Sequence, residues 1–376
     1  MKYSKRVLCL LLCFLFTFPV SIWAKAPLTE PEASAYIMIE KDTGTVLAQK
    51  NETERRAMAS ITKLMTVYLI LEDIDSQKLS LTDTITASAN ASAMGGSQIY
   101  LKENEEMDVD TLLKSIFVAS ANDACVAMAE HLEGSVDAFV KRMNDKAKEL
   151  GLNDTAYKNP HGLDEDGHYS TAKDIATLSR LVLSHPLTKT YSGIWQDTIR
   201  DGTFELTNTN KLVHYYDGIT GLKTGSTTNA GSCLSASAKR NGMELIAVVL
   251  NSPTSEMRFT DAKQLLDYGF ANYQITQLTN PEEAYSKTTI AYAKQESVNL
   301  YPKESLPFLQ EKTSEKEPVR RAEFYPLTAP VSKGTVAGKL TFEVDGTVVK
   351  ETDLIIKEDV QKQSFWDVFQ QFLRML

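Results

Sequence analysis

The amino-acid sequence predicts a domain of mixed helices and strands followed by a small all-β domain. Residues from about 33 to 274 interleave short strands with longer segments whose apolar residues recur at helical spacing. After about residue 278 the strand-like alternation of apolar and polar residues returns. Asp345-Gly346, between two alternating segments, is a strong hairpin signal.

The first 26 residues are predicted to be a signal peptide. A positively charged start precedes an almost wholly apolar run over residues 7–20, and Ala24-Lys25-Ala26 has the small-x-small pattern of a cleavage site. An uncleaved anchor is the alternative, but the apolar run is too short to span a bilayer comfortably. We therefore expect an exported protein.

Charge and cysteine content exclude two classes of protein. The net charge is -9, and removing the signal peptide takes away four cations and no acids, which leaves about -13. Nucleic-acid binding needs clustered Lys and Arg, so no nucleic-acid partner is expected. Only Cys125 and Cys233 would remain after cleavage. One bridge between them is possible, but we expect two free, buried thiols rather than a disulfide framework.

The elements of the first domain, residues 27–277, are predicted in order along the chain. Strands 36–40 and 45–48 form a hairpin around Asp42-Thr43-Gly44. Helical spacing then predicts five helices, at 57–71, 107–119, 121–132, 136–150 and 171–184. A late pair of strands, around Lys223 and over 244–250, precedes a helix at 255–268.

The second domain is expected over residues 278–360. Alternation predicts strands at 288–292, 297–301, 336–344 and 347–349. The charged segment 311–321 is expected to be a loop.

The last segment, 361–376, is predicted to form an amphipathic helix. Six large apolar residues fall on one side of it, with Lys362 and Arg374 nearby: Phe365, Trp366, Phe369, Phe372, Leu373 and Leu376. Such a helix is too short to span a membrane but suits its interface. A helix that caps the β-domain is the alternative. We expect attachment to a membrane surface through residues 364–376.

The first of three short motifs is Ser60-Ile61-Thr62-Lys63. A lysine three residues after a serine lies one helical turn away on the same face, so its amine can reach the hydroxyl. Serine is a poor nucleophile until a base takes its proton. Lysine can be that base only if burial or a second cation lowers its pKa.

The other two motifs add groups that a peptide substrate would need. Ser120-Ala121-Asn122 lies between two predicted helices, where a hydroxyl could pass protons and an amide could hold a substrate carbonyl or Lys63. A helix cap is the alternative there. Lys223-Thr224-Gly225 lies on a predicted strand that could pair with an extended peptide. Lys223 would meet a terminal carboxylate and act as the second cation beside Lys63.

The combination of the three motifs, in this order, resembles the penicillin-recognising serine enzymes. It is most similar to the low-molecular-mass D-alanyl-D-alanine carboxypeptidases. Asn159-Pro160-His161-Gly162-Leu163 and His168-Tyr169-Ser170-Thr171, the β-domain and the amphipathic tail extend the resemblance to nearly the whole mature chain. It implies a serine transpeptidase or β-lactamase-like domain: an antiparallel sheet flanked by helices, a helical lobe, and a cleft between them. A small all-β sandwich would follow.

The resemblance also implies a role for each motif residue. Ser60 would be acylated by a peptidoglycan stem peptide that ends in D-Ala-D-Ala, with Lys63 as the base and Ser120 relaying a proton to the leaving amine. The substrate-binding residues would be Asn122, Lys223, Thr224, Gly225, Ser226 and Arg258. The backbone N–H groups of Ser60 and Ser226 would form an oxyanion hole. β-Lactam antibiotics would acylate Ser60 as substrate mimics, and no metal or cofactor is implied.

Two other signals are explained by local structure. Glu149-Leu150-Gly151-Leu152-Asn153 matches the loop that supplies the deacylating glutamate of class A β-lactamases, but it ends a helical pattern and Gly151 is a natural C-cap. A penicilloyl adduct should therefore persist. The zinc ligand set His161, Asp164, Asp166 and His168 is disfavoured, because the glycines around it predict a loop.

Two alternative functions share these motifs. One is a D,D-endopeptidase of cross-links, but those relatives often lack the β-domain and the tail. The other is a membrane-bound penicillin or peptidoglycan binder without turnover, but every catalytic residue type is present here.

Overall fold

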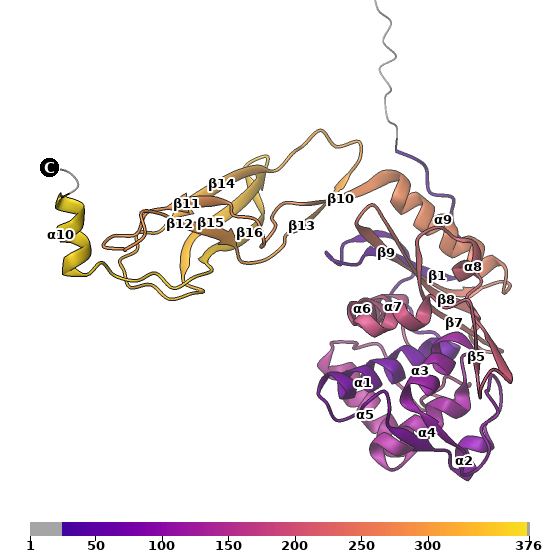
Figure 1. The fold of residues 1–376 in the computed structure, drawn as a ribbon. Coiled ribbons are helices and arrows are strands. Elements are labelled where there is room, and N and C mark those ends of the chain that lie inside the picture. Colours follow the sequence, from indigo (N-terminus) through magenta and orange to yellow (C-terminus); the bar gives the residue numbers. More distant parts are fainter. Residues whose placement is uncertain (1–24, 374–376) are drawn as a thin grey trace, which may run out of the picture.

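A five-stranded antiparallel sheet forms the centre of the first domain (Figure 1). The computed structural model describes residues 25–373 of the chain. The strand order is β2-β1-β9-β8-β7, with the bounds Val46–Lys50, Ala35–Glu40, Met243–Ser252, Gly231–Arg240 and Ile219–Thr227. The predicted hairpin at 36–48 is confirmed as β1 and β2.

Helices cover both faces of this sheet, because alternate residues of each strand point to opposite sides. Ile37 and Val248 belong to the core shared with the helical lobe, whereas Met38 and Val249 pack against α9, Met257–Asn272. The lobe consists of α1 and α3 to α6: Lys63–Asp75, Val109–Val118, Asn122–Glu133, Val136–Glu149 and Ala172–Ser184. The fold class that the resemblance implied is therefore confirmed.

Shorter elements complete the first domain. They are the helices α2 Ala89–Ser92, α7 Pro186–Ser192 and α8 Leu212–Tyr215, the hairpin of β3 Thr84–Thr86 with β4 Glu106–Asp108, and the hairpin of β5 Gln196–Ile199 with β6 Phe204–Thr207.

Two predictions for the first domain need correction. The helix expected at 57–71 begins only at Lys63, after a 3-10 turn over Ala59–Thr62. Ala59 has a φ of +48°, which no right-handed helix contains. The late strands are three rather than two, because β8 lies between β7 and β9. Its Ser and Ala side chains have little strand propensity, and its pairing on both edges outweighs that weakness.

The second domain contains a five-stranded antiparallel sheet in the order β11-β12-β16-β15-β14. The bounds are Ser286–Thr288, Val298–Pro302, Thr347–Ile356, Val336–Val344 and Val319–Phe324. A second pair, β10 Tyr273–Gln277 with β13 Pro307–Glu311, follows directly from α9. The hairpin at Asp345-Gly346 is confirmed. The loop predicted at 311–321 is partly wrong, because β14 begins at Val319 as an exposed edge strand whose charges conceal it in the sequence.

The predicted tail helix is confirmed as α10, Phe365–Leu373, and Figure 1 shows it at the end of the β-domain remote from the first domain. Phe365 is 75% exposed and Trp366 is 67% exposed, so the helix does not cap the β-domain. Arg374, Leu376 and residues 1–24 of the predicted signal peptide lie outside the described residues. Between residues 25 and 373, no helix is long and apolar enough to cross a membrane.

Candidate active site

Ser60 lies on the 3-10 turn that precedes α1, against the edge strand β7. Gly225 of β7 faces this turn so closely that a Cβ there would lie 2.7 Å from Met58 O and 3.1 Å from Ser60 N. Only glycine lets the strand approach the turn at this point. The first and third motifs are thereby brought together.

Lys63 is fully buried, and its amine has three hydrogen-bond partners. Its Nζ lies 2.8 Å from Ser60 Oγ, 2.7 Å from Asn122 Oδ1 and 2.7 Å from His161 O. Burial lowers the pKa of Lys63 to about 8, against a smaller opposite effect of Cys125 and Asp123. A large fraction of this amine is therefore neutral near pH 8.

Two of these partners can only accept. The Asn122 Nδ2 group donates to Gly95 O at 2.7 Å, so its Oδ1 is the atom that faces Lys63. The His161 carbonyl oxygen is likewise an acceptor. A neutral amine has two N–H groups and one lone pair. If it donates to these two oxygens, its lone pair is directed at the Ser60 hydroxyl.

Ser120 lies between α3 and α4, with a φ of +61°. It accepts a hydrogen bond of 2.9 Å from Lys223 Nζ, which also donates to Thr224 O at 3.2 Å. Burial, and then the charge of Lys63, lower the pKa of Lys223 well below its ordinary value. The repulsion expected between the two amines is seen in the lowered pKa of Lys223, whereas burial is the main cause of the Lys63 shift.

Arg258 lies near Lys223 and bonds to the backbone of the third motif. Arg258 is 7% exposed, donates to Gly225 O at 3.0 Å, and has a buried Nε without a partner among the described residues. Thr224 Oγ1 donates to Thr209 Oγ1 at 2.7 Å. Among the described residues neither Arg258 nor Lys223 is paired with a carboxylate, so a bound anion would be stabilised by Arg258 and would favour the charged form of Lys223. Ser226 follows on β7 with an exposed side chain.

Comparisons with known proteins show which family the chain belongs to. Residues 22–254 match the D-alanyl-D-alanine carboxypeptidase family, and residues 273–362 match the C-terminal domain of penicillin-binding protein 5. The chain is 40% identical over 373 residues to D-alanyl-D-alanine carboxypeptidase DacF of Bacillus subtilis (strain 168), with 96% of each chain covered. It belongs to the D-alanyl-D-alanine carboxypeptidase family.

Two solved structures extend the comparison. Penicillin-binding protein 5 of Haemophilus influenzae is 30% identical with a TM-score of 0.74, and the match covers 90% of this chain and 100% of that one. Penicillin-binding protein D2 of Listeria monocytogenes, solved in an ampicillin-bound form, is 32% identical with a TM-score of 0.60. That match covers 65% of this chain and all of the Listeria chain.

Three features of this carboxypeptidase-family site have no signal in the sequence motifs. The His161 carbonyl binds Lys63, and Thr209 binds the hydroxyl of Thr224. Gly162, with a φ of +92°, packs so tightly on the turn that a Cβ there would lie 2.0 Å from Ala59 O. The bond to a backbone carbonyl and the contact with a distant threonine belong to no sequence motif, although Gly162 lies in the segment Asn159-Pro160-His161-Gly162-Leu163.

The two alternative signals have structural explanations. Glu149 is the last residue of α5 and pairs with Lys146 at 2.8 Å, while Gly151 has a φ of +72°, so the helix-end interpretation is confirmed. Asp164 accepts from Thr227 Oγ1. No group of three or more His, Cys, Asp or Glu side chains in residues 25–373 could hold a metal ion. The two cysteines are free and buried, as predicted.

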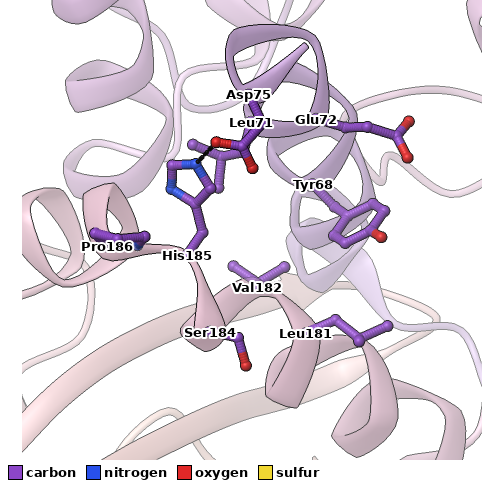
Figure 2. A pocket seen from close by; sticks show the side chains of 9 residues that line it. All are labelled: Tyr68, Leu71, Glu72, Asp75, Leu181, Val182, Ser184, His185 and Pro186. Carbon is purple, nitrogen blue, oxygen red and sulfur yellow. Dashed lines mark hydrogen bonds and ion pairs between the residues drawn. The ribbon is translucent and has the colours of Figure 1, made fainter. Parts of the chain in front are cut away.

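A separate hollow of about 290 Å³ lies at the other end of α1, beside the junction of α6 and α7 (Figure 2). The dashed line in Figure 2 joins His185 Nε2 to Asp75 Oδ1, which are 2.9 Å apart. Asp75 is twelve residues beyond Lys63, about 18 Å along the helix at 1.5 Å per residue. This hollow is therefore distinct from the Ser60 site.

Proposed function

We propose that this protein is a serine-type D-Ala-D-Ala carboxypeptidase that removes the terminal D-alanine from peptidoglycan pentapeptide stems. The buried Lys63 amine, 2.8 Å from Ser60 Oγ and bound by two obligatory acceptors, is the observation that carries this proposal. It supplies a base for the hydroxyl without a histidine.

In this proposal the neutral Lys63 amine takes the Ser60 proton as Oγ bonds to the carbonyl carbon of the penultimate D-Ala. The tetrahedral oxyanion is stabilised by the backbone N–H groups of Ser60 and Ser226. The C–N bond then breaks, and the leaving amine of D-alanine receives a proton through Ser120. Water hydrolyses the acyl-enzyme by the reverse proton path.

Substrate binding is assigned to the neighbouring groups. The free edge of β7 would pair with the extended peptide, as an added strand does. Its terminal carboxylate would lie near Lys223, Thr224 and Arg258, and would raise the pKa of Lys223 again. Asn122 would hold both Lys63 and the substrate, and Gly225 would permit the close approach.

β-Lactams would acylate the same serine. Penicillin-binding protein D2 of Listeria monocytogenes, 32% identical to this chain, has been solved in ampicillin-bound and cefotaxime-bound forms. Glu149 forms an ion pair with Lys146 at the end of α5, so this β-lactamase-like glutamate would not activate water at the acyl-enzyme. The penicilloyl-enzyme is therefore expected to persist.

The direct test is to incubate the purified mature protein with a pentapeptide that ends in D-Ala-D-Ala and to measure free D-alanine. Release by the wild type and none by Ser60→Ala supports the proposal. Cleavage confined to cross-linked dimers would favour the endopeptidase. Stable labelling by penicillin without any D-Ala release would favour a binder that does not turn over.

We further propose an exported enzyme that α10 attaches to the outer face of the cytoplasmic membrane. The large apolar side chains of α10 are exposed, and their aromatic rings are of the type found at membrane interfaces. Trp366→Glu with Phe369→Glu should abolish sedimentation with anionic phospholipid vesicles. Val348→Glu, at a half-exposed apolar residue of the β-domain, is the matched control. Unchanged sedimentation of the double variant would contradict the anchor.

A further inference from the structure

A chain of buried hydrogen bonds connects the loop after α5 with the turn that carries Ser60. Lys158 N lies 3.0 Å from His168 Nδ1, His168 Nε2 lies 2.7 Å from Thr62 Oγ1, and Thr62 Oγ1 donates to Ala59 O at 2.8 Å. His168 is 6% exposed and Thr62 is 0% exposed, so water cannot replace these partners readily.

The direction of this chain is fixed by its first donor. A backbone N–H can only donate, so Lys158 N makes His168 Nδ1 an acceptor. The neutral ring then carries its proton on Nε2 and donates it to Thr62 Oγ1. Burial lowers the pKa of His168 to about 4, so the neutral ring persists wherever Lys63 can act as a base. The Thr62 hydroxyl, which accepts from His168, therefore donates its own proton to Ala59 O.

Fixing Ala59 O also fixes the Ser60 N–H. The two atoms belong to one planar trans peptide group and point in opposite directions. The hydrogen bonds of the turn run from Ile61 N to Met58 O and from Lys63 N to Ser60 O, so neither uses the Ser60 N–H.

The turn requires such support, because Ala59 has a φ of +48°, which is unfavourable for a residue with a Cβ. Gly162 packs against the same carbonyl, where a Cβ would lie 2.0 Å from Ala59 O. We propose that Thr62 and His168 are positioning residues that aim the Ser60 N–H at the oxyanion of the tetrahedral intermediate. This inference rests on the proposed function, since it concerns the acylation of Ser60.

The test compares Thr62→Val, which removes the hydroxyl at similar volume, with Thr62→Ser, which keeps it. Thr62→Val should lower kcat for D-Ala release, and the rate of acylation by a fluorescent penicillin, by about 10–100-fold, because a misdirected oxyanion donor loses much of its effect. KM should stay within about twofold. Thr62→Ser should recover most of both rates.

The histidine gives an independent second pair. His168→Leu removes the donor to Thr62, whereas His168→Gln can place an amide N–H near the position of Nε2. We expect His168→Leu to slow acylation about tenfold and His168→Gln to restore part of the rate. This pair repeats the test if Thr62→Val fails to fold.

Thr66→Val is the matched control, because this buried threonine, one turn further along in α1, donates to Pro160 O at 2.6 Å rather than to the 3-10 turn. It should lower the melting temperature about as much as Thr62→Val and leave acylation within about twofold. Wild-type acylation in Thr62→Val, or an equal loss in Thr66→Val, would overturn the inference. If the wild type released no D-alanine while Thr62→Val still slowed penicillin acylation, the proposed function would fail and this inference would stand.

Discussion

Lys63 and Lys223 are both buried, yet their surroundings give them different tasks. Lys63 contacts the nucleophile and two obligatory acceptors, which suits an amine that gains and loses a proton. Lys223 contacts the Ser120 hydroxyl and lies near an arginine without a carboxylate partner, which suits the recognition of an anion. Two lysine side chains therefore have different roles because different atoms surround them.

Lys63→Arg tests whether the amine must be neutral. A guanidinium stays protonated at any working pH, so it keeps the charge but cannot accept a proton. We expect the rate of Ser60 acylation by penicillin to fall by about 10²–10⁴-fold, the usual contribution of a general base. Circular dichroism checks that the variant folds. A folded variant with more than a tenth of wild-type activity would be inconsistent with Lys63 as the base.

The two buried histidines predict how stability depends on pH. Burial lowers the pKa of His161 to about 3 and that of His168 to about 4, below an unfolded value near 6.5. The unfolded chain therefore binds more protons between pH 6.5 and 4, and stability is lost as pH falls through this window. Each histidine should lower the free energy of unfolding by about 2 kcal/mol at pH 5 relative to pH 7.

Urea unfolding at several pH values measures this loss. His168→Gln removes one of the two titrating groups, so its stability should fall less steeply on acidification than that of the wild type. Equal slopes for the two proteins would show that His168 titrates normally.

Among the elements, β7 and the 3-10 turn define the site through one close approach. Gly225→Ala would place a methyl group 2.7 Å from Met58 O, so the strand and the turn must separate. We expect at least a tenfold loss of acylation, because shifts of about 1 Å at a reacting centre can cost 10²-fold. Gly193→Ala, after α7 and without a positive φ, should retain activity. Wild-type acylation by Gly225→Ala would refute the close-packing argument.

In the whole molecule, every residue assigned to the site lies between Met58 and Arg258, in the first domain. The β-domain has its own core, and α10 lies at its far end (Figure 1). A chain that stops at Asn272 should therefore keep kcat for a soluble pentapeptide within about threefold while losing vesicle binding. A hundredfold loss of kcat in a folded truncation would show that the β-domain shapes the site.

The sequence predicted the parts of this molecule that depend on local spacing. The Ser-x-x-Lys motif predicted the pair Ser60 and Lys63, and the residue pattern around a turn predicted the β1–β2 hairpin. The structure also brings the three motifs together. The sequence could not predict the positive φ of Ala59 or the hydrogen bond between Lys63 Nζ and His161 O, because both depend on packing between segments far apart in the chain. The strand β8 was missed because its small residues pair on both edges despite weak propensity.

The pH dependence of Ser60 acylation by a β-lactam, measured in the pre-steady state, tests the buried-base mechanism most directly. Acylation should rise with pH along a limb whose apparent pKa is about 8, the value that burial gives Lys63. A rate that is flat from pH 6 to 9, or that rises only near the ordinary lysine pKa of about 10.4, would contradict a neutral amine as the base.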